Sequence, residues 1–290
     1  MVEQLPDKIG FKYLSTHIKT LNLIIKIFKN KEFLIGFIIA SFFTIISFIG
    51  NYFVPYNPNS INLNQPFLPP SWSHLFGTDY LGRDVFSRTM VGGTVSIEVG
   101  LAAGLLVVVI GGIIGVFSGY YGGGVDILVQ RIVDIILALP IIVFVLVLLT
   151  IINSSTLTII IAVSFLSWPT LARIVRSETL SLKEKEFILS EKLAGASGFH
   201  IIFKHLIPNE ISSFIVYSGL AISNAILVQA ALAYLGFSGS SVSWGFDLYM
   251  AQQYIMGGYW WIMFFPGLAI TLTALGFYLI SEGLRKVMSG

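Results

Sequence analysis

A polar segment with the sequence SLKEKEFILSEKLAGASGFHIIFKHLIP, from Ser181 to Pro208, separates two long apolar stretches of the chain. It belongs to a longer linker, residues 173–210, whereas a few residues are enough to join two helices of a bundle. The segment also carries helix start and stop signals, so it is predicted to be structured. We therefore expect an element with a function of its own between two membrane spans.

Two short helices are predicted within this segment. Ser181 and Glu184 form a capping box, in which the two side chains satisfy free amide groups at a helix start. Gly195 is a good C-terminal stop for that helix. Ser197 can then cap a second short helix, which is expected to end before Pro208 because a proline disfavours a helical residue ahead of it.

The second short helix carries an apolar stripe, which consists of Phe199, Ile202, Phe203 and Leu206. Such a stripe is too large to leave in water. Two short helices at a sharp glycine bend would form a protruding knob, and a knob of this kind suits a groove on a soluble partner. The alternative interpretation is an ordinary loop at the membrane interface.

The composition indicates the solvent that surrounds the rest of the chain. Of 290 residues, 55% are hydrophobic and 11% are charged, and the mean hydropathy is +0.84. Soluble domains average about 25% charged residues, so most of this chain is expected to lie in lipid. The chain contains no cysteine, which excludes disulfides and thiolate metal sites.

Six apolar stretches are long enough to cross a bilayer, which takes roughly 20 helical residues. Because the stretches are continuous rather than alternating, we predict an all-α membrane protein with six transmembrane helices. Pro140 is expected to bend the third of them. The six predicted spans are Phe33–Phe53, Val95–Ser118, Ile132–Ile152, Leu157–Ala172, Ile211–Leu235 and Tyr259–Ser281.

The basic residues give the predicted orientation. If six helices alternate, 15 of the 17 Lys and Arg residues fall on one side, which predicts that both termini are cytoplasmic. Apolar residues from Leu14 to Phe28 are spaced as in an amphipathic surface helix, although a simple basic anchor is the alternative. The predicted segments are a cytoplasmic N-terminal segment (1–32), the first helix (33–53), an extracytoplasmic segment (54–94), a five-helix core (95–281) with the cytoplasmic loop 173–210, and a cytoplasmic tail (282–290).

The polar segment resembles the signature loop of permease subunits of ATP-binding cassette (ABC) importers. Gly195 and Pro208 stand at the positions of that family's glycine and proline, with Ile207 in place of the usual leucine. The segment departs from the pattern at Leu189-Ser190-Glu191, where Glu-Ala-Ala is usual, and at His205, where isoleucine is usual. The resemblance implies that an ATPase contacts the residues Glu186, Phe187, Leu189, Glu191, Gly195, Ala196, Ser197, Phe199, Phe203, His205 and Pro208.

The resemblance extends along the chain from residue 76 to the C-type permeases of the oligopeptide, dipeptide and nickel group. It implies the fold of a type I ABC importer permease in the cell membrane. It also implies a second, similar permease, two ATP-binding subunits and an extracytoplasmic substrate-binding protein as partners. The motifs that carry it are Phe76–Arg88, Trp168–Arg173, Ala230–Gly236, Ser243–Gly245, Pro266–Ile270 and Glu282–Arg285.

Signals for chemistry within the chain are lacking. No Gly-x-x-x-x-Gly-Lys-Ser/Thr loop occurs, so ATP and Mg²⁺ are expected on partner subunits, and this chain is expected to be neither an enzyme nor a cofactor carrier. The four histidines show no spacing suited to a metal site, and no nucleic-acid partner is expected. Peptides are the first choice of substrate and oligosaccharides the second.

A rival interpretation is a secondary transporter or channel that works without ATP. It predicts paired inverted repeats and several ionisable residues within the spans, and the sequence has neither. Glu98, near the outer end of the second span, is a candidate for the transport pathway that would favour cationic groups; hydration at headgroup depth is the alternative. Asp134 is expected to pair with Arg131 and so to stabilise a helix end.

Four charged residues recur outside the membrane at spacings of four, one and four, namely Asp79, Arg83, Asp84 and Arg88. They are expected to form a salt-bridge cluster that orders a short helix on the membrane. The functional alternative is contact with the binding protein through Asp79, Arg83 and Asp84. Trp244, in the outer loop 236–258, is a further candidate for that contact.

Overall fold

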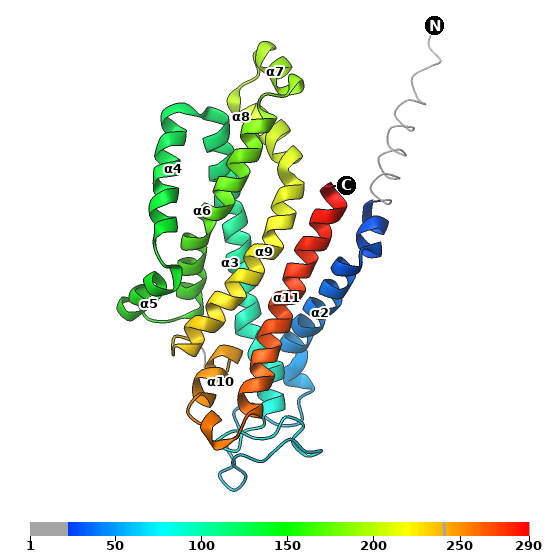
Figure 1. Cartoon of the computed structure of the whole chain (residues 1–290), viewed down its shortest axis with the longest axis vertical. Helices are drawn as coiled ribbons and strands as arrows, with labels where there is room; N and C mark the ends of the chain where they lie inside the picture. Colours follow the sequence, from blue (N-terminus) through cyan, green and yellow to red (C-terminus); the bar gives the residue numbers. More distant parts are fainter. Residues whose placement is uncertain (1–22, 240–241, 290) are drawn as a thin grey trace.

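The computed structural model describes residues 23–239 and 242–289, and helices form the long elements of this part of the chain (Figure 1). A π-helical turn, Ile202–Leu206, joins α8 to α9, and short 3₁₀ turns occur at Gly50–Tyr52 and Ile255–Gly257. The prediction of an all-α membrane protein is confirmed. The labelled helices are α2 (Lys31–Ile49), α3 (Val85–Tyr121), α4 (Gly123–Ala138), α5 (Ile141–Ile151), α6 (Thr156–Leu182), α7 (Glu186–Leu193), α8 (Gly198–Ile201), α9 (Ile207–Tyr234), α10 (Trp244–Ala251) and α11 (Trp261–Ser289).

The long helices form one elongated bundle (Figure 1). Helix α3 packs against α6 and α9, while α11 packs against α2 and α9. We call the end that carries α7 the α7 end and the opposite end, which carries α10, the α10 end. The start of α2 and the close of α11 lie together toward the α7 end, where Lys286 forms an ion pair with Glu32.

Five helices are each long and apolar enough to cross a membrane, namely α2, α3, α6, the continuous α8–α9 and α11. The bent pair α4–α5 supplies a sixth span if it counts as one. At 1.5 Å per residue, α4 is about 24 Å long and α5 about 16 Å, so neither alone crosses a hydrocarbon core of about 30 Å. The count of six is therefore confirmed only with the bent pair as the third span.

The predicted bend at Pro140 is a full break. Helices α4 and α5 meet at 84°, and Figure 1 shows α5 lying across the bundle. Leu139 and Pro140 adopt extended backbone between them, as expected for a proline and the residue before it.

Helix α3 begins at Val85, well before the span predicted from Val95. Asp84 caps its start, because an oxygen of its carboxylate accepts a hydrogen bond from the Ser87 amide at 2.8 Å. Its 37 residues give a length of about 55 Å, which exceeds the hydrocarbon core. Hydropathy could not detect the first turns because they carry charged and polar side chains.

Glycines permit the closest helix contacts in the bundle. A Cβ atom at Gly36 of α2 would lie 2.6 Å from the carbonyl oxygen of Gly276 in α11, and one at Gly283 would lie 2.5 Å from the Phe33 amide nitrogen. Small residues at such contacts let two membrane helices approach backbone to backbone. The pairing of α2 with α11 thus depends on these glycines.

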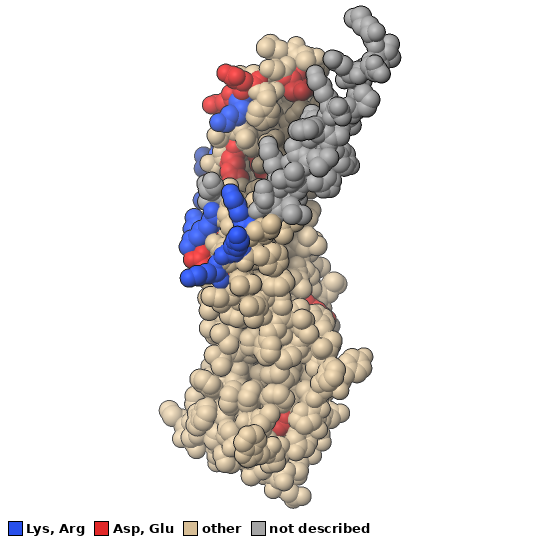
Figure 2. Space-filling model, turned by 90° about the vertical axis from the view of Figure 1, so that its right-hand side faces the viewer, with Lys and Arg blue, Asp and Glu red and all other residues tan. Residues whose placement is uncertain are grey.

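Charge is distributed unevenly along the molecule. Figure 2 shows one face, on which Lys, Arg, Asp and Glu gather near the α7 end and a broad middle zone is almost free of them. Such a zone is typical of a surface in contact with lipid tails. The amphipathic helix predicted from Leu14 to Phe28 lies largely outside the described residues, of which 23–29 are helical.

Candidate functional site

Helix α6 extends further into the polar segment than the sequence predicted. It runs to Leu182, and the Lys183 amide still donates to the Thr179 carbonyl at 2.9 Å. The predicted capping box at Ser181 and Glu184 is therefore wrong. Extending a formed helix by a turn costs less than starting a new one, so α7 begins only at Glu186, after a short turn.

The glycine stop is confirmed in detail. Gly195 has φ +82°, a left-handed conformation that favours glycine. Its amide donates to the Lys192 carbonyl at 3.0 Å, and the Ala196 amide donates to the Glu191 carbonyl at 3.0 Å. These two bonds form a Schellman motif, which closes α7 and turns the chain back toward the bundle.

The second short helix starts as predicted but does not end before Pro208. The Ser197 hydroxyl accepts a hydrogen bond from the His200 amide at 3.3 Å. The chain then passes through the π-helical turn into α9, where Pro208 lies in the first turn. The π-helical turn interrupts the regular α-helical hydrogen bonding just ahead of Pro208, so the proline is accommodated as it is at a helix start. Two helices predicted as separate thus form one continuous rod.

We call residues 183–206 the knob. It caps the α7 end of the bundle (Figure 1), and its inner side is fully buried. Ile188 of α7 packs in one apolar cluster with Ile201, Ile202 and Leu206, together with side chains of α3 and α6. The predicted exposed stripe is therefore only half correct, because Ile202 and Leu206 face inward.

The outer side of the knob leaves large apolar side chains in solvent. Leu193 is 90% exposed, Phe199 60% and Phe203 55%, and Phe187 and Leu189 are also exposed. The rings of Phe199 and Phe203 stack in parallel with centroids 6.4 Å apart. Burying such side chains is favourable by roughly 1.5–3 kcal/mol each, so the outer side of the knob is a candidate contact surface.

One hydrogen bond joins the base of the knob to α3, and a second one joins α6 to α9 directly below it. The Lys183 ammonium donates to the Gly119 carbonyl at the end of α3 at 2.9 Å, where a cation also complements the helix dipole. The Thr179 hydroxyl donates to a carboxylate oxygen of Glu210 at 2.7 Å, and both side chains are buried. These contacts tie α3, α6 and α9 together directly below α7.

A charged network supports the same region, and the sequence reasoning missed it. Arg176 of α6 donates two hydrogen bonds to Asp126 of α4, each 2.5 Å long. The Ser118 hydroxyl of α3 donates to the same carboxylate at 2.6 Å. The basic residue ahead of the knob was visible in the sequence, but its partner lies fifty positions away. Local spacing could not have paired the two.

The remaining predicted knob residues lie on its surface. Glu186 begins α7 and is exposed, whereas Ala196 is half-buried beneath the glycine turn. Glu191 points toward His205, with a carboxylate oxygen 3.5 Å from Nε2 of the ring. The structure thus places ten of the eleven residues that the resemblance implied in the knob, and Pro208 follows in the first turn of α9.

At the α10 end, the predicted four-residue cluster resolves into three separate contacts. Asp79 pairs with Arg83 at 2.6 Å, and Asp84 contacts His74 at 2.9 Å while it caps α3. Arg88 donates to Asp247 of α10. No helix forms between residues 79 and 84, so the predicted short helix is wrong. Asp79 instead accepts hydrogen bonds from the Leu81 and Arg83 amides of a tight turn.

The pair between Arg88 and Asp247 is buried. The Nε atom of the arginine donates to a carboxylate oxygen at 2.9 Å, and another guanidinium nitrogen donates to the Pro58 carbonyl at 3.0 Å. Burial raises the pKa of the Asp247 carboxyl, and the charge and hydrogen bonds of Arg88 oppose that rise. The pair joins the start of α3 to α10 at the α10 end of the bundle.

Burial argues against three of the four predicted contacts with a binding protein. Trp244 is fully buried, and its ring N–H donates to the Thr89 carbonyl at 2.6 Å. Asp79 and Asp84 are also buried, whereas Arg83 lies partly at the surface. The three buried side chains hold segments of the α10 end together, and the contact with a binding protein stays a prediction.

Within the bundle, Asp134 pairs with Arg173 rather than with Arg131. The predicted pair is wrong because α4 packs on α6, which brings the arginine of the neighbouring helix within reach. Glu98 lies exposed on α3.

A cavity of about 230 Å³ lies between α3, α5, α6 and α9. Its wall is mostly apolar, and the Ser167 hydroxyl is buried there with no hydrogen-bond partner in the described part of the chain. Sequence reasoning missed this cavity because uncharged polar residues within apolar spans give no signal. The polar residues of its lining are Ser167, Thr170, Tyr217 and Asn224.

Comparisons with known proteins agree with this geometry. The family described as "Binding-protein-dependent transport system inner membrane component" matches residues 111–289, more than half of the chain. The N-terminal transmembrane domain of oligopeptide transport permease C matches residues 23–70.

Three relatives cover most of the chain. It is 37% identical to the dipeptide transport system permease protein DppC of Bacillus subtilis, over 90% of this chain and 82% of the relative. It is 38% identical to the oligopeptide transport system permease protein OppC of the same species, over 89% and 85%. It is 36% identical to DppC of Alkalihalophilus pseudofirmus, over 90% and 86%. The chain therefore belongs to the family of binding-protein-dependent transport system inner membrane components and is a multi-pass permease of the inner membrane.

Proposed function

We propose that this chain is one of two permease subunits of an ATP-driven importer and that an ATPase subunit binds its knob. The observation that carries the proposal is the set of exposed apolar side chains on a rigidly mounted knob. The distribution of Lys and Arg along the sequence supports a cytoplasmic position for the α7 end, where soluble ATPases would lie.

In this proposal the knob works as a lever. The two ATPase subunits close when they bind ATP and Mg²⁺, which this chain does not bind itself. Because the base of the knob is bonded to α3, α6 and α9, movement of the knob moves these helices as a unit. The two permeases would then switch between two packings that open toward opposite sides.

We place the transport pathway along the cavity between α3, α5, α6 and α9, completed by the sister permease. Its polar groups are uncharged, which suits a path that binds cargo weakly and lets it leave. Glu98 lies outside this lining. We propose that Glu98 faces the sister subunit near the outer mouth of the path, since a carboxylate among apolar residues favours a polar neighbour over lipid.

Peptides are the proposed cargo. The names of the relatives specify dipeptide and oligopeptide transport, and a binding protein on the outer face would deliver the substrate. Mass spectrometry of the ligand retained by the co-purified binding protein tests this. A peptide is the expected result, and an oligosaccharide would overturn the proposed cargo.

The ATPase contact is tested by purifying the tagged chain from native membranes in mild detergent and quantifying the ATPase subunits that remain bound. Phe203→Ala is compared with Phe165→Ala, a control on α6 with nearly equal exposure, 56% against 55%. A central aromatic contact is worth about 2 kcal/mol or more, so the first variant is expected to lose most of the ATPase. Equal retention in both variants would contradict the proposal, and a wild-type chain recovered without any ATPase would favour the secondary transporter.

A further inference from the structure

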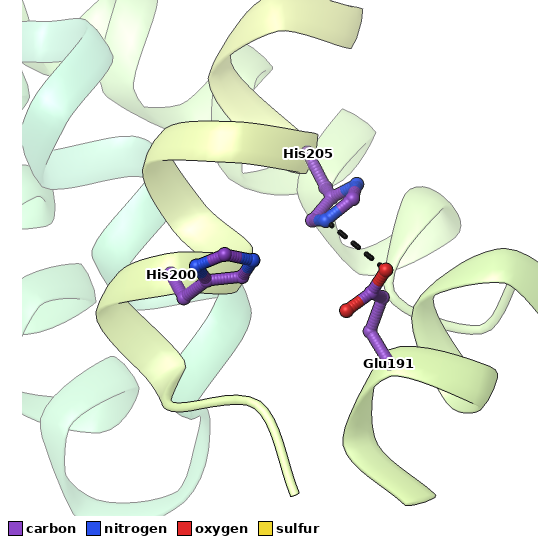
Figure 3. Close-up of side chains that lie close together, drawn as sticks. All are labelled: Glu191, His200 and His205. Carbon is purple, nitrogen blue, oxygen red and sulfur yellow. Dashed lines mark ion pairs between the residues drawn. The ribbon is translucent and has the colours of Figure 1, made fainter. Parts of the chain in front are cut away.

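Three side chains with metal-binding atoms meet at the angle between α7 and α8. They are Glu191 of α7, His200 of α8 and His205 of the π-helical turn (Figure 3). One ligand atom from each lies within 4.8 Å of the others. Figure 3 shows both rings and the carboxylate turned toward the same gap between the two helical segments.

The π-helical turn explains why the spacing of the histidines does not predict this site. His200 and His205 are five residues apart, and in a regular α-helix that separation places two side chains about 140° apart around the axis. The wider turn, in which the Ile207 amide donates to the Ile202 carbonyl, reduces this separation. The two imidazole centroids lie 5.7 Å apart. Such turns are rare and often occur at functional sites.

One ring nitrogen of the cluster lacks a bonding partner, and a cation would provide one. Nε2 of His205 is shielded from solvent and has no hydrogen-bond partner among the described residues. A buried polar atom without a partner is costly, so it calls for an explanation. The ring faces Glu191, whose carboxylate oxygen is 3.5 Å away, too far for a good hydrogen bond.

That separation fits two ligands of one metal ion. With bonds of about 2.0–2.2 Å, neighbouring ligands of a tetrahedral Zn²⁺ lie roughly 3.3–3.5 Å apart. His205 and Glu191 already have this spacing. His200 is exposed, so its ring can rotate by the small amount that brings a ring nitrogen to the same ion as a third ligand. Two imidazoles favour Zn²⁺ and similar transition metals over Mg²⁺ or Ca²⁺, which prefer oxygen ligands.

We propose that Glu191, His200 and His205 form a binding site for a divalent transition metal of the Zn²⁺ class, with a fourth position open to water. The ion would bridge the two sides of the Gly195 turn and lock α7 against α8. The positive charge of the neighbouring Lys192 is engaged by another side chain, because its ammonium lies over the Tyr120 ring, 5.3 Å from the centroid. A bound metal ion would thus add a side-chain link between α7 and α8, which the backbone joins through the Gly195 turn.

The site is tested on the full-length chain in detergent after treatment with a chelator. Zn²⁺ is titrated by calorimetry, and the absorption spectrum of Co²⁺ reports the coordination geometry. We expect one Zn²⁺ per chain and the visible bands of a tetrahedral Co²⁺ site. His205→Ala and Glu191→Gln are each expected to weaken binding by at least about tenfold. Glu184→Gln, an exposed carboxylate just before α7, is the matched control and should bind like wild type.

A rescue variant separates ligand loss from misfolding. His205→Cys replaces the imidazole by a thiolate ligand in a chain that has no other cysteine, and it should bind Zn²⁺ again and shift the Co²⁺ spectrum. Equal binding by wild type and a variant lacking all three ligands would overturn the site. Hydrogen exchange of the α7 amides should slow when Zn²⁺ is added, and unchanged exchange would overturn the clamp. Neither measurement depends on an ATPase partner.

Discussion

Replacing Gly195 tests whether the proposed ATPase partner recognises the shape of the knob. A Cβ atom at this position would meet nothing within 4 Å, so a substitution causes no collision. The cost is confined to the backbone, since φ is +82° and a residue with a Cβ pays about 1–2 kcal/mol in that conformation. Gly195→Ala should therefore reduce the population of the native turn roughly 5- to 30-fold relative to alternatives.

Gly195→Pro should have a larger effect for two reasons. Proline fixes φ near −65°, which is incompatible with +82°, and it removes the amide that donates to the Lys192 carbonyl. The native turn then cannot form, so coupling of ATP hydrolysis to transport should be abolished. Membrane insertion should be unaffected because none of the apolar spans is altered. Gly195→Asn should lie between glycine and alanine, since asparagine tolerates this conformation best among the other residues.

The assay reconstitutes each variant with its partners in liposomes and measures transport and ATPase activity stimulated by the loaded binding protein. Gly258→Ala is the matched control, because Gly258 has φ +84° and equally open surroundings but lies in the outer loop. The Gly258→Ala variant should co-purify with the ATPase subunits to the same extent as the wild-type chain. Normal coupled transport by Gly195→Pro would refute the lever. An order of activity other than Gly, Asn, Ala, Pro would refute the backbone argument.

Three further substitutions probe the frame that carries the knob. Arg88→Ala leaves the Asp247 carboxylate buried without its partner, so it should destabilise the purified chain by about 3–5 kcal/mol in thermal unfolding, and the double change to Met and Leu should recover most of the loss. Gly36→Leu forces α2 away from α11 and should lower the melting temperature and loosen their cross-linking, whereas Ile38→Leu at an exposed position of α2 should not. Trp244→Phe removes the hydrogen bond to the Thr89 carbonyl in a buried site and should cost about 1–3 kcal/mol, visible as faster proteolysis of the outer loop.

Local signals predicted the parts of the structure that local physics determines. The continuous apolar runs gave the spans because lipid requires them. Gly195 and Ser197 gave the turn and the cap of the knob, since each acts on backbone groups only a few residues away. Even the break at Pro140 followed from the missing amide of one residue, although the sequence did not indicate its size.

Pairings between distant segments could not be predicted in the same way. Asp134 has an arginine three positions before it, yet it bonds to Arg173 of a neighbouring helix. Arg88 and Asp247 are 159 positions apart, so only the packing of α10 against α3 brings them together. Trp244 in a mostly uncharged outer loop fits a membrane anchor or a partner contact as well as a buried core, and composition does not separate these. Sequence reasoning therefore could not tell buried side chains of this loop from exposed ones.

The position of the anchoring bonds argues that the knob is built to transmit force. A lever transmits force only if its base is more rigid than its contact surface. The two regions of the knob differ in this way. Lys183 at the base bonds to the Gly119 carbonyl of α3, and the buried bond from Thr179 to Glu210 joins the helices α6 and α9 beneath it. The outer side carries side chains that are half exposed or more, such as Leu193, Phe199 and Phe203. Loss of the base should therefore uncouple ATP hydrolysis from transport even where the ATPase still binds, whereas loss of the outer aromatic residues should release the ATPase and leave the bundle intact.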